Sequence, residues 1–193
     1  LGMKSHARVV VVGGGVVGVS PLYHLAKKGW SDVVLVERKE LTSGSTWHAA
    51  GLLPLFNMSY SVGQIHKYSV KFYQELQKET GMDVGFRNVS NIRLACNQDR
   101  MDEFRQYAGV ASTIGVQVDF LTPEQVLDYW PMANIDGLVG AIRHPQDGYI
   151  QPADLTQALA RGARDRGAEI YRNTAVAAIT RSEDGLWIVS TDK

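Results

Sequence analysis

The feature that most constrains the fold is a run of valines followed by three glycines near the start of the chain. Residues 8–12, with four consecutive valines, predict a strand buried on both faces, because continuous β-branched residues suit a parallel sheet. Residues 16–28 then predict a helix that stops at Gly29. A second buried strand follows at Val33–Val36. Strand, helix and strand in this order predict a βαβ unit with a right-handed crossover.

The glycines between the first strand and the helix have the spacing G-x-G-x-x-G, which is typical of dinucleotide-binding folds. Gly13 allows a tight turn, Gly15 lets the backbone approach a pyrophosphate, and Gly18 lets the helix pack closely on the sheet. The N–H groups of Val16 and Val17, at the helix N-terminus, are suited to binding phosphate. This context favours a dinucleotide site over a glycine turn that serves packing alone.

An acidic residue ends the second strand, where dinucleotide-binding folds contact the ribose. Glu37 lies about 20 residues beyond the glycines, and we expect it to accept hydrogen bonds from ribose hydroxyls. Its negative charge disfavours a 2′-phosphate, so the residues leave NAD and FAD as alternatives. Arg38 follows directly. An acid–base pair here is more typical of flavoproteins, although a solvated surface pair explains Arg38 equally well.

The segment GSTWHAAGLL, residues 44–53, is too rich in glycine for a good helix and too apolar for an ordinary surface loop. Ser45 and Thr46 are suited to cap a short helix that begins near Trp47. The small residues that follow leave room for a flat ring to approach the backbone. From the residues alone, His48 is more simply a hydrogen-bonded packing residue than a ligand.

The rest of the chain alternates between helices and strands. We expect helices at 61–80, around 101–111, from Thr122 to near Trp130 with a capping box, and at 152–166. We expect strands at 91–96, on both sides of a turn within 138–152, and at 175–180 and 186–190 around an Asp184-Gly185 hairpin turn. Pro21 lies inside the first helix, where proline costs about 3 kcal/mol, and predicts a kink or local loosening.

The composition narrows the possible partners. Twenty basic residues balance twenty acidic ones, so we expect no nucleic-acid partner. No apolar run is long enough to span a bilayer, and we expect no membrane partner and no metal site. Cys96 is the single cysteine, which excludes an intrachain disulfide.

Three segments together resemble the dimethylglycine and sarcosine dehydrogenases, which are D-amino-acid-oxidase-like flavoproteins. They are VVVVGGGVVGVS, VLVERKELTSGSTWHAAG and DGYIQPADLTQALARGA, and the similarity runs over nearly all of the chain. The resemblance implies FAD as the cofactor and oxidation of the carbon–nitrogen bond of N-methylated glycines. Pro21 departs from the family pattern, in which an apolar residue other than proline is usual.

The resemblance also implies how FAD is held. In the mitochondrial members the histidine of STWHAAG is joined covalently to the 8α-methyl carbon of the flavin, and this position is His48 here. With the glycines of the turn, the predicted cofactor-binding residues are Gly13, Gly15, Val16, Val17, Gly18, Glu37, Arg38, Gly44, Ser45, Thr46, Trp47, His48, Ala49, Ala50, Gly51, Leu52 and Val176. We assign no catalytic residue, because the groups that handle the substrate are expected mostly beyond residue 193. His144 and Tyr149 are polar, but a surface turn and a core tyrosine explain them more simply.

The predicted fold class is α/β, with an incomplete Rossmann-type FAD-binding βαβ domain and part of an inserted mixed α+β substrate domain. We expect residues 1–84 to be the first FAD-binding segment, 85–150 part of the substrate domain, and 151–193 a truncated second FAD-binding segment. Only two clear strands of the nucleotide-binding sheet are recognisable, so we expect this chain to be the N-terminal part of a longer protein. Such a fragment alone is expected to be inactive, and whether it holds FAD by itself is open.

The expected reaction is transfer of a hydride equivalent from an N-methyl carbon to flavin, followed by hydrolysis of the iminium to an aldehyde and the demethylated amine. The substrate is then a small N-methylated amine, and the electron acceptor is oxygen or an electron-transfer flavoprotein. Folate use would depend on a further C-terminal region. The alternatives are a related flavoenzyme for another small amine or amino acid, and a non-catalytic relative similar to the regulatory subunit of pyruvate dehydrogenase phosphatase. The expected compartment is the bacterial cytoplasm or the mitochondrial matrix.

Overall fold

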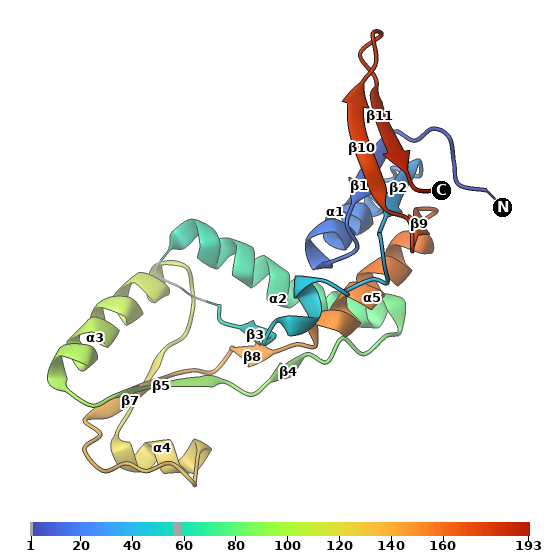
Figure 1. The fold of residues 1–193 in the computed structure, drawn as a ribbon. Coiled ribbons are helices and arrows are strands. Elements are labelled where there is room, and N and C mark those ends of the chain that lie inside the picture. The colour runs from blue at the N-terminus through green and yellow to red at the C-terminus, as the bar shows by residue number, and fades with distance from the viewer. Residues whose placement is uncertain (1, 56–58) are drawn as a thin grey trace. The chain divides into compact units, whose positions relative to one another are not determined.

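The computed structural model describes residues 2–55 and 59–193 (Figure 1). These form two compact units, each described by itself below. The first comprises Leu1–Gly51, Tyr73–Gly85 and Gln151–Lys193, and the second comprises Leu52–Phe72 and Phe86–Ile150. Residues 52–72, which we expected in the first segment, group with the second unit. The assignment of these units to FAD and substrate binding stays a prediction.

The first unit is built on a parallel three-stranded sheet in the order β1-β2-β9. These strands are Val9–Val12, Val33–Val36 and Glu169–Tyr171. All four residues of β2 are buried, as its continuous apolar run predicts. The expectation that β1 is buried on both faces was wrong, because β1 is an edge strand of the described sheet and its residues alternate between partly buried and exposed. The expectation of only two strands was incomplete. β9 is three residues long and only partly buried, so it lacks the apolar run that identifies a buried strand.

Two helices of this unit, α1 (Val16–Lys27) and α5 (Pro152–Arg164), pack against each other. The ring of Tyr23 is fully buried, and a Cβ added to Gly162 would come within 2.7 Å of it. A glycine at 162 therefore lets the two helices approach closely. The helix α1 continues through Pro21, which is exposed, so the loosening expected from this proline does not interrupt the helix.

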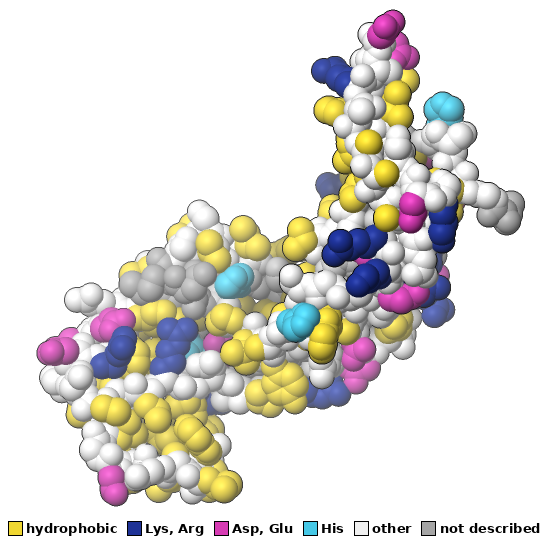
Figure 2. Space-filling model, viewed as in Figure 1, with side chains coloured by type: hydrophobic (Ala, Val, Ile, Leu, Met, Phe, Trp, Pro, Cys, Tyr) yellow, Lys and Arg dark blue, Asp and Glu magenta, His cyan; other side chains and the backbone are white. Residues whose placement is uncertain are grey.

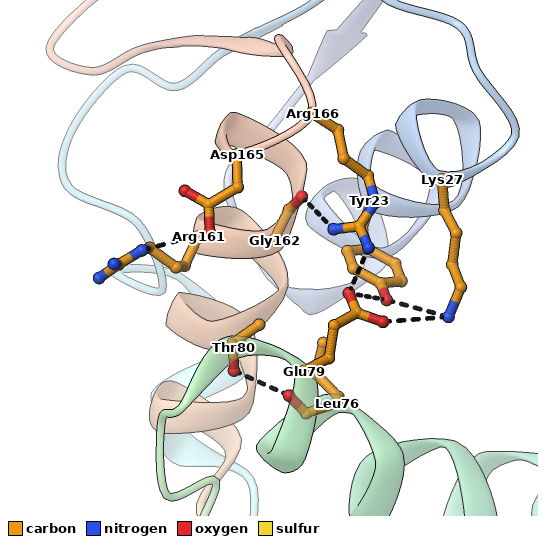
Figure 3. A network of polar contacts seen from close by, with 9 residues as sticks. All are labelled: Tyr23, Lys27, Leu76, Glu79, Thr80, Arg161, Gly162, Asp165 and Arg166. Atoms are coloured by element: carbon orange, nitrogen blue, oxygen red, sulfur yellow. Dashed lines mark hydrogen bonds and ion pairs between the residues drawn. The ribbon is translucent and has the colours of Figure 1, made fainter.

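A polar network joins α1, the C-terminal part of α2 (Tyr60–Thr80) and the residues after α5 (Figure 3). The Glu79 carboxylate accepts a hydrogen bond of 2.6 Å from the Tyr23 hydroxyl, and it pairs with Lys27 at 3.3 Å and Arg166 at 2.8 Å. Burial opposes ionisation, but the hydrogen bonds from Tyr23 and Lys27 outweigh it and hold the pKa of Glu79 below its ordinary value. One charged carboxylate thus links three separate segments of the unit.

The end of the chain forms an antiparallel hairpin of β10 (Val176–Arg181) and β11 (Trp187–Thr191). Gly185 has φ +85, which fits the turn expected at Asp184-Gly185. Apolar side chains are exposed along the hairpin, as the yellow atoms in Figure 2 show; they include Ile179, Leu186, Trp187 and Ile188.

The second unit contains an antiparallel sheet in the order β5-β7-β6, with strands Asn91–Ala95, Gly140–His144 and Asp119–Leu121. The helix α3 (Gln98–Thr113) contributes Met101, Phe104 and Tyr107 to a core that also contains Ile142 of β7. The helix α4 (Pro123–Tyr129) has the expected capping box. Thr122 and Gln125 each accept a hydrogen bond from the other's backbone N–H, at 3.3 Å and 2.9 Å.

A second small sheet of this unit has the order β3-β8-β4, with strands Leu52–Leu53, Gly148–Tyr149 and Arg87–Asn88. The two strands expected on both sides of the turn within 138–152 are β7 and β8, and they belong to different sheets. The apolar pattern locates strands but does not identify their partners.

No helix in residues 2–55 and 59–193 combines the length and the apolar character needed to cross a bilayer. Within the same described ranges, no group of three or more histidine, cysteine, aspartate or glutamate side chains is arranged to hold a metal ion.

Candidate cofactor site

The turn between β1 and α1 requires glycine at two of its positions for steric reasons. Gly13 has φ +108, a conformation that other residues rarely adopt. A Cβ added to Gly18 would lie 2.0 Å from the Gly13 carbonyl oxygen, which is backbone and cannot give way. The G-x-G-x-x-G spacing therefore has the steric basis expected of a tight strand-to-helix turn.

The middle glycine, Gly14, was not among the predicted site residues, yet it is as constrained as its neighbours. It is buried, and a Cβ added to it would come within 2.6 Å of the Leu41 side chain and 2.9 Å of Glu37 Cγ. Its N–H donates a hydrogen bond of 2.6 Å to Glu37 Oε2. The sequence carried a signal for this residue, namely its position between the two predicted glycines Gly13 and Gly15.

The carboxylate of Glu37 links the end of β2 to the glycine turn. Its second oxygen, Oε1, accepts a hydrogen bond of 2.8 Å from the Lys39 N–H. Each carboxylate oxygen can accept more than one hydrogen bond, so both keep acceptor capacity for a ligand hydroxyl. The side chain is only partly buried, which leaves this capacity accessible.

Thr46 connects the Gly44–Ala49 segment to the start of α1. It lies in the 3₁₀ helix η1 (Ser45–His48) and is only 7% exposed. Its hydroxyl oxygen accepts a hydrogen bond of 3.0 Å from the Val16 N–H. The expectation that Ser45 or Thr46 caps its own short helix was wrong, because η1 has no side-chain cap. Thr46 instead satisfies a free N–H group at the N-terminus of α1, thirty residues earlier in the sequence.

A cavity of about 410 Å³ opens between these segments, within the size range of small-ligand sites. A Cβ added to Gly13 or Gly44 would meet no protein atom within 4 Å, so both glycines border open space. The cavity is lined by Gly13, Gly14, Gly15, Val17, Glu37, Arg38, Lys39, Ser43, Gly44, Ser45 and Thr46. Gly14, Lys39 and Ser43 were not predicted from the sequence, although each is adjacent to a predicted residue.

The other predicted residues lie outside this lining. Val16 uses its N–H to contact Thr46. Ala49 and Ala50 are exposed, and Gly51 has φ +72. Leu52 belongs to the second unit. Val176 is the first residue of β10. The chain just before it is tied to Glu37, because the Thr174 N–H donates a hydrogen bond of 2.9 Å to the Glu37 carbonyl oxygen.

Trp47 and His48 are both exposed, and their rings are in contact. Their ring centroids are 4.0 Å apart, with the planes tilted by 40°. His48 Nδ1 lies 3.2 Å from the Gly44 carbonyl oxygen. Because a carbonyl can only accept, Nδ1 must carry the proton, and a neutral His48 therefore has its free lone pair on Nε2. His48 is thus hydrogen-bonded, as its sequence context alone favours, but it is exposed and not buried in a core.

His144 and Tyr149, in the second unit, reverse the expected environments. His144 is 1% exposed, neither of its ring nitrogens has a hydrogen-bond partner among the described residues, and its ring meets that of Tyr107 edge-on at 5.3 Å. Burial first, and then the charge of Arg93, lower the pKa of His144 to about 4. Tyr149, by contrast, is 42% exposed. His144 is therefore a neutral core residue and not part of a surface turn.

Comparison with known proteins gives one family for nearly the whole chain. The DAO model, described as FAD dependent oxidoreductase, matches residues 8–193. The crystal structure of L-proline dehydrogenase from P. horikoshii superposes with a TM-score of 0.91 at 25% identity. This superposition covers 98% of this chain and 50% of that one.

Curated relatives are more similar in sequence but much longer. Mitochondrial dimethylglycine dehydrogenase of Rattus norvegicus is 42% identical over 97% of this chain, which spans 22% of that protein. Mitochondrial sarcosine dehydrogenase of Homo sapiens is 38% identical over 92% of the chain, which spans 19% of it. The pyruvate dehydrogenase phosphatase regulatory subunit of Mus musculus is 35% identical over 100% of the chain, which spans 22% of it.

Proposed function

Because this chain belongs to the DAO family of FAD dependent oxidoreductases, we propose that the cavity beside the glycine turn binds the adenine-dinucleotide part of FAD. The observation that carries this proposal is the joint position of the turn, Glu37 and η1 around one cavity. The N-terminus of α1 provides a positive dipole for phosphate, and Val17 lines the cavity there, whereas the Val16 N–H, which was expected to bind phosphate, is bound to Thr46. Glu37 retains acceptor capacity for ribose hydroxyls, and its charge disfavours a 2′-phosphate.

The residues present fit such a ligand sterically. Much of the cavity wall is glycine, and the open space beside Gly13 and Gly44 is where a dinucleotide backbone would approach. Arg38 and Lys39, which also line the cavity, contribute positive charge beside a pyrophosphate. When bound, FAD supplies the redox chemistry by accepting two electrons from the substrate. The contributions of this chain are to bind and orient the cofactor.

We further propose that His48 holds FAD covalently. The support from geometry is that His48 is exposed and that its contact with the Gly44 carbonyl leaves Nε2 as the nitrogen with a free lone pair. An unprotonated ring nitrogen is what attack on a carbon atom requires. The support from sequence is the STWHAAG segment, in which the resemblance to the dimethylglycine and sarcosine dehydrogenases identifies the histidine as the attachment point.

The substrate that this relationship favours is an N-methylated glycine, either dimethylglycine or sarcosine. With FAD bound, the expected chemistry is oxidation of the N-methyl carbon–nitrogen bond, and hydrolysis would then release formaldehyde and the demethylated amine. The similarity to dimethylglycine dehydrogenase and sarcosine dehydrogenase supports this substrate class. The electron acceptor, oxygen or an electron-transfer flavoprotein, and any use of folate depend on parts of the relatives that this chain does not span.

A regulatory, non-catalytic role is the second candidate, because the regulatory subunit of a phosphatase matches the whole chain. The Trp47-His48 pair favours the enzyme, since the resemblance places no such pair in that subunit. The mitochondrial relatives favour the mitochondrial matrix as the compartment, with the bacterial cytoplasm as the alternative.

The test uses the protein in its full natural length. We expect a yellow protein whose flavin stays with the polypeptide after acid precipitation and is bleached anaerobically by dimethylglycine or sarcosine. His48→Ala should release the flavin on acid treatment while still binding FAD. A colourless protein that oxidises neither amine would contradict the enzymatic function. Flavin that stays attached in His48→Ala would show that another residue is the anchor.

A further inference from the structure

Trp47 is not buried in a core, so core packing does not explain the presence of a tryptophan at this position. The side chain is 60% exposed, although tryptophan is usually well buried. Its described ring contact is with the imidazole of His48, at 4.0 Å between ring centroids. The pair occupies the end of η1, whose first residues line the cofactor cavity. The described ring contact of Trp47 is therefore with His48, and this contact restricts the orientation of the imidazole.

Two contacts restrict the His48 ring from different directions. The indole of Trp47 lies against the imidazole at 4.0 Å between ring centroids, with the planes tilted by 40°, and the Gly44 carbonyl oxygen lies 3.2 Å from Nδ1. The indole contact limits rotation of the imidazole, and the contact with the carbonyl selects the tautomer with the proton on Nδ1. This leaves Nε2 as the ring nitrogen with a lone pair for bond formation.

The segment that carries both rings is itself anchored. Thr46 precedes Trp47, and its hydroxyl accepts the hydrogen bond from the Val16 N–H at the start of α1. The turn then closes with a hydrogen bond of 3.2 Å from the Ala49 N–H to the Thr46 carbonyl oxygen. The segment is therefore anchored at Thr46 before the pair and closed by a local turn after it, so Trp47 contacts a ring on a well-defined backbone turn.

We infer that Trp47 is a positioning residue for the attachment of flavin to His48, an inference that rests on the covalent link proposed above. In the attachment, Nε2 of His48 forms a bond to the 8α-carbon as a C–H bond of that carbon breaks. The hydrogen from this carbon and the proton from Nδ1 pass, with two electrons, to the flavin ring, and dioxygen then reoxidises it. Holding Nε2 in one direction before this step lowers its entropic cost.

The test compares Trp47→Ala and Trp47→Phe with Trp187→Ala, which removes a tryptophan of similar exposure from β11. Each full-length apoprotein, produced in flavin-depleted cells, is mixed with FAD, and acid-stable flavin is followed by intact mass and in-gel fluorescence. We expect Trp47→Ala to slow attachment about tenfold or more, since misorientation of a reacting group has effects of this size. Trp47→Phe keeps a stacking ring and should restore most of the rate, and Trp187→Ala should attach flavin like the wild type.

Two further measurements distinguish a role of Trp47 in positioning His48 from a role in binding FAD. In a His48→Ala background, Trp47→Ala should leave the dissociation constant for FAD, measured by fluorescence quenching, within about threefold, because one exposed side chain is changed. A parallel loss of FAD affinity would make Trp47 a binding residue and overturn the inference. In ¹⁵N NMR spectra of the flavin-free apoproteins, the His48 ring should be the Nδ1-protonated tautomer in the wild type and a mixture in Trp47→Ala.

An unchanged attachment rate in Trp47→Ala, or an unchanged tautomer, would overturn the positioning role while leaving the covalent link intact. A wild-type protein without acid-stable flavin would overturn the covalent link and the role of Trp47 together. FAD binding, which the quenching experiment measures separately, would still stand in that case.

Discussion

The hydroxyl oxygen of Thr46 accepts a hydrogen bond of 3.0 Å from the N–H of Val16, and so joins the STWH segment to the N-terminus of α1. The two residues belong to the two motifs that identify the site, and Thr46 is 7% exposed. Together with the hydrogen bond of 3.0 Å from the Thr42 N–H to the Gly14 carbonyl oxygen, this contact holds the segment that carries His48 beside the glycine turn. Thr46 also lines the cavity.

Thr46→Val keeps the shape of the side chain but removes the acceptor for the Val16 N–H. We expect the apoprotein to lose about 1 kcal/mol of unfolding free energy, the usual net value of such a hydrogen bond. Attachment of flavin at His48 should also slow, because η1 loses its anchor. Thr46→Ser keeps the acceptor and is the matched control. Equal denaturation midpoints for the valine and serine variants would show that the contact contributes nothing to stability.

Glu37→Gln should weaken FAD binding about tenfold or more. The two carboxylate oxygens accept hydrogen bonds from Gly14 and Lys39, and the amide that replaces one oxygen would direct N–H groups at an N–H donor. Hydrogen bonds to a charged group are typically worth about 1.5–3 kcal/mol. Titration of apoprotein with FAD, followed by fluorescence quenching, measures the change. Glu40→Gln, at an exposed residue paired with Arg172, is the control and should bind FAD normally.

Two glycine-to-alanine changes in helices should have opposite effects on stability. A Cβ at Gly162 would lie 2.7 Å from the Tyr23 ring, so Gly162→Ala should cost about 1–3 kcal/mol through overpacking of α1 against α5. Gly109 lies in α3, and a Cβ there would meet nothing within 4 Å. Gly109→Ala should therefore stabilise the protein by up to about 1 kcal/mol through helix propensity. Chemical denaturation measures the unfolding free energy of each variant. A stabilising Gly162→Ala would mean that α1 and α5 can move apart at little cost in free energy.

Stability should fall between pH 7 and pH 5 partly because of His144. Burial holds the pKa of His144 at about 4 in the folded protein, against an ordinary value of 6.5. The unfolded chain therefore binds more protons than the folded one between these values, so acidification favours unfolding. The contribution is about 2 kcal/mol between pH 7 and pH 5.

His144→Leu isolates this contribution, because the other titrating groups are the same in both proteins. The difference in unfolding free energy between the variant and the wild type should shift by about 2 kcal/mol in favour of the variant on going from pH 7 to pH 5. Denaturant titrations at the two pH values measure it. A difference that does not change with pH would mean that His144 gains a proton as easily in the folded protein as in the unfolded one.

Local sequence was sufficient where short-range sterics and apolar patterns determine structure. The valine runs predicted β1 and β2, and the capping box at Thr122 predicted the start of α4, because these features depend on neighbours within a few residues. The motifs also led to the family, which the match over residues 8–193 confirms. β9 escaped prediction because three partly buried residues carry too little pattern, and it is a strand only because β2 provides its hydrogen-bond partners.

The amino-acid sequence by itself determined the βαβ unit, the glycine turn and the family, since each depends on residue type and spacing. The tertiary structure decided what the individual side chains do. It brought Thr46 to the N–H of Val16, gave Gly14 its contact with Glu37, and placed His144 in a core and not on the surface. The physical reason is that hydrogen-bond partners and burial depend on which distant segments meet, and spacing along one chain does not specify such meetings.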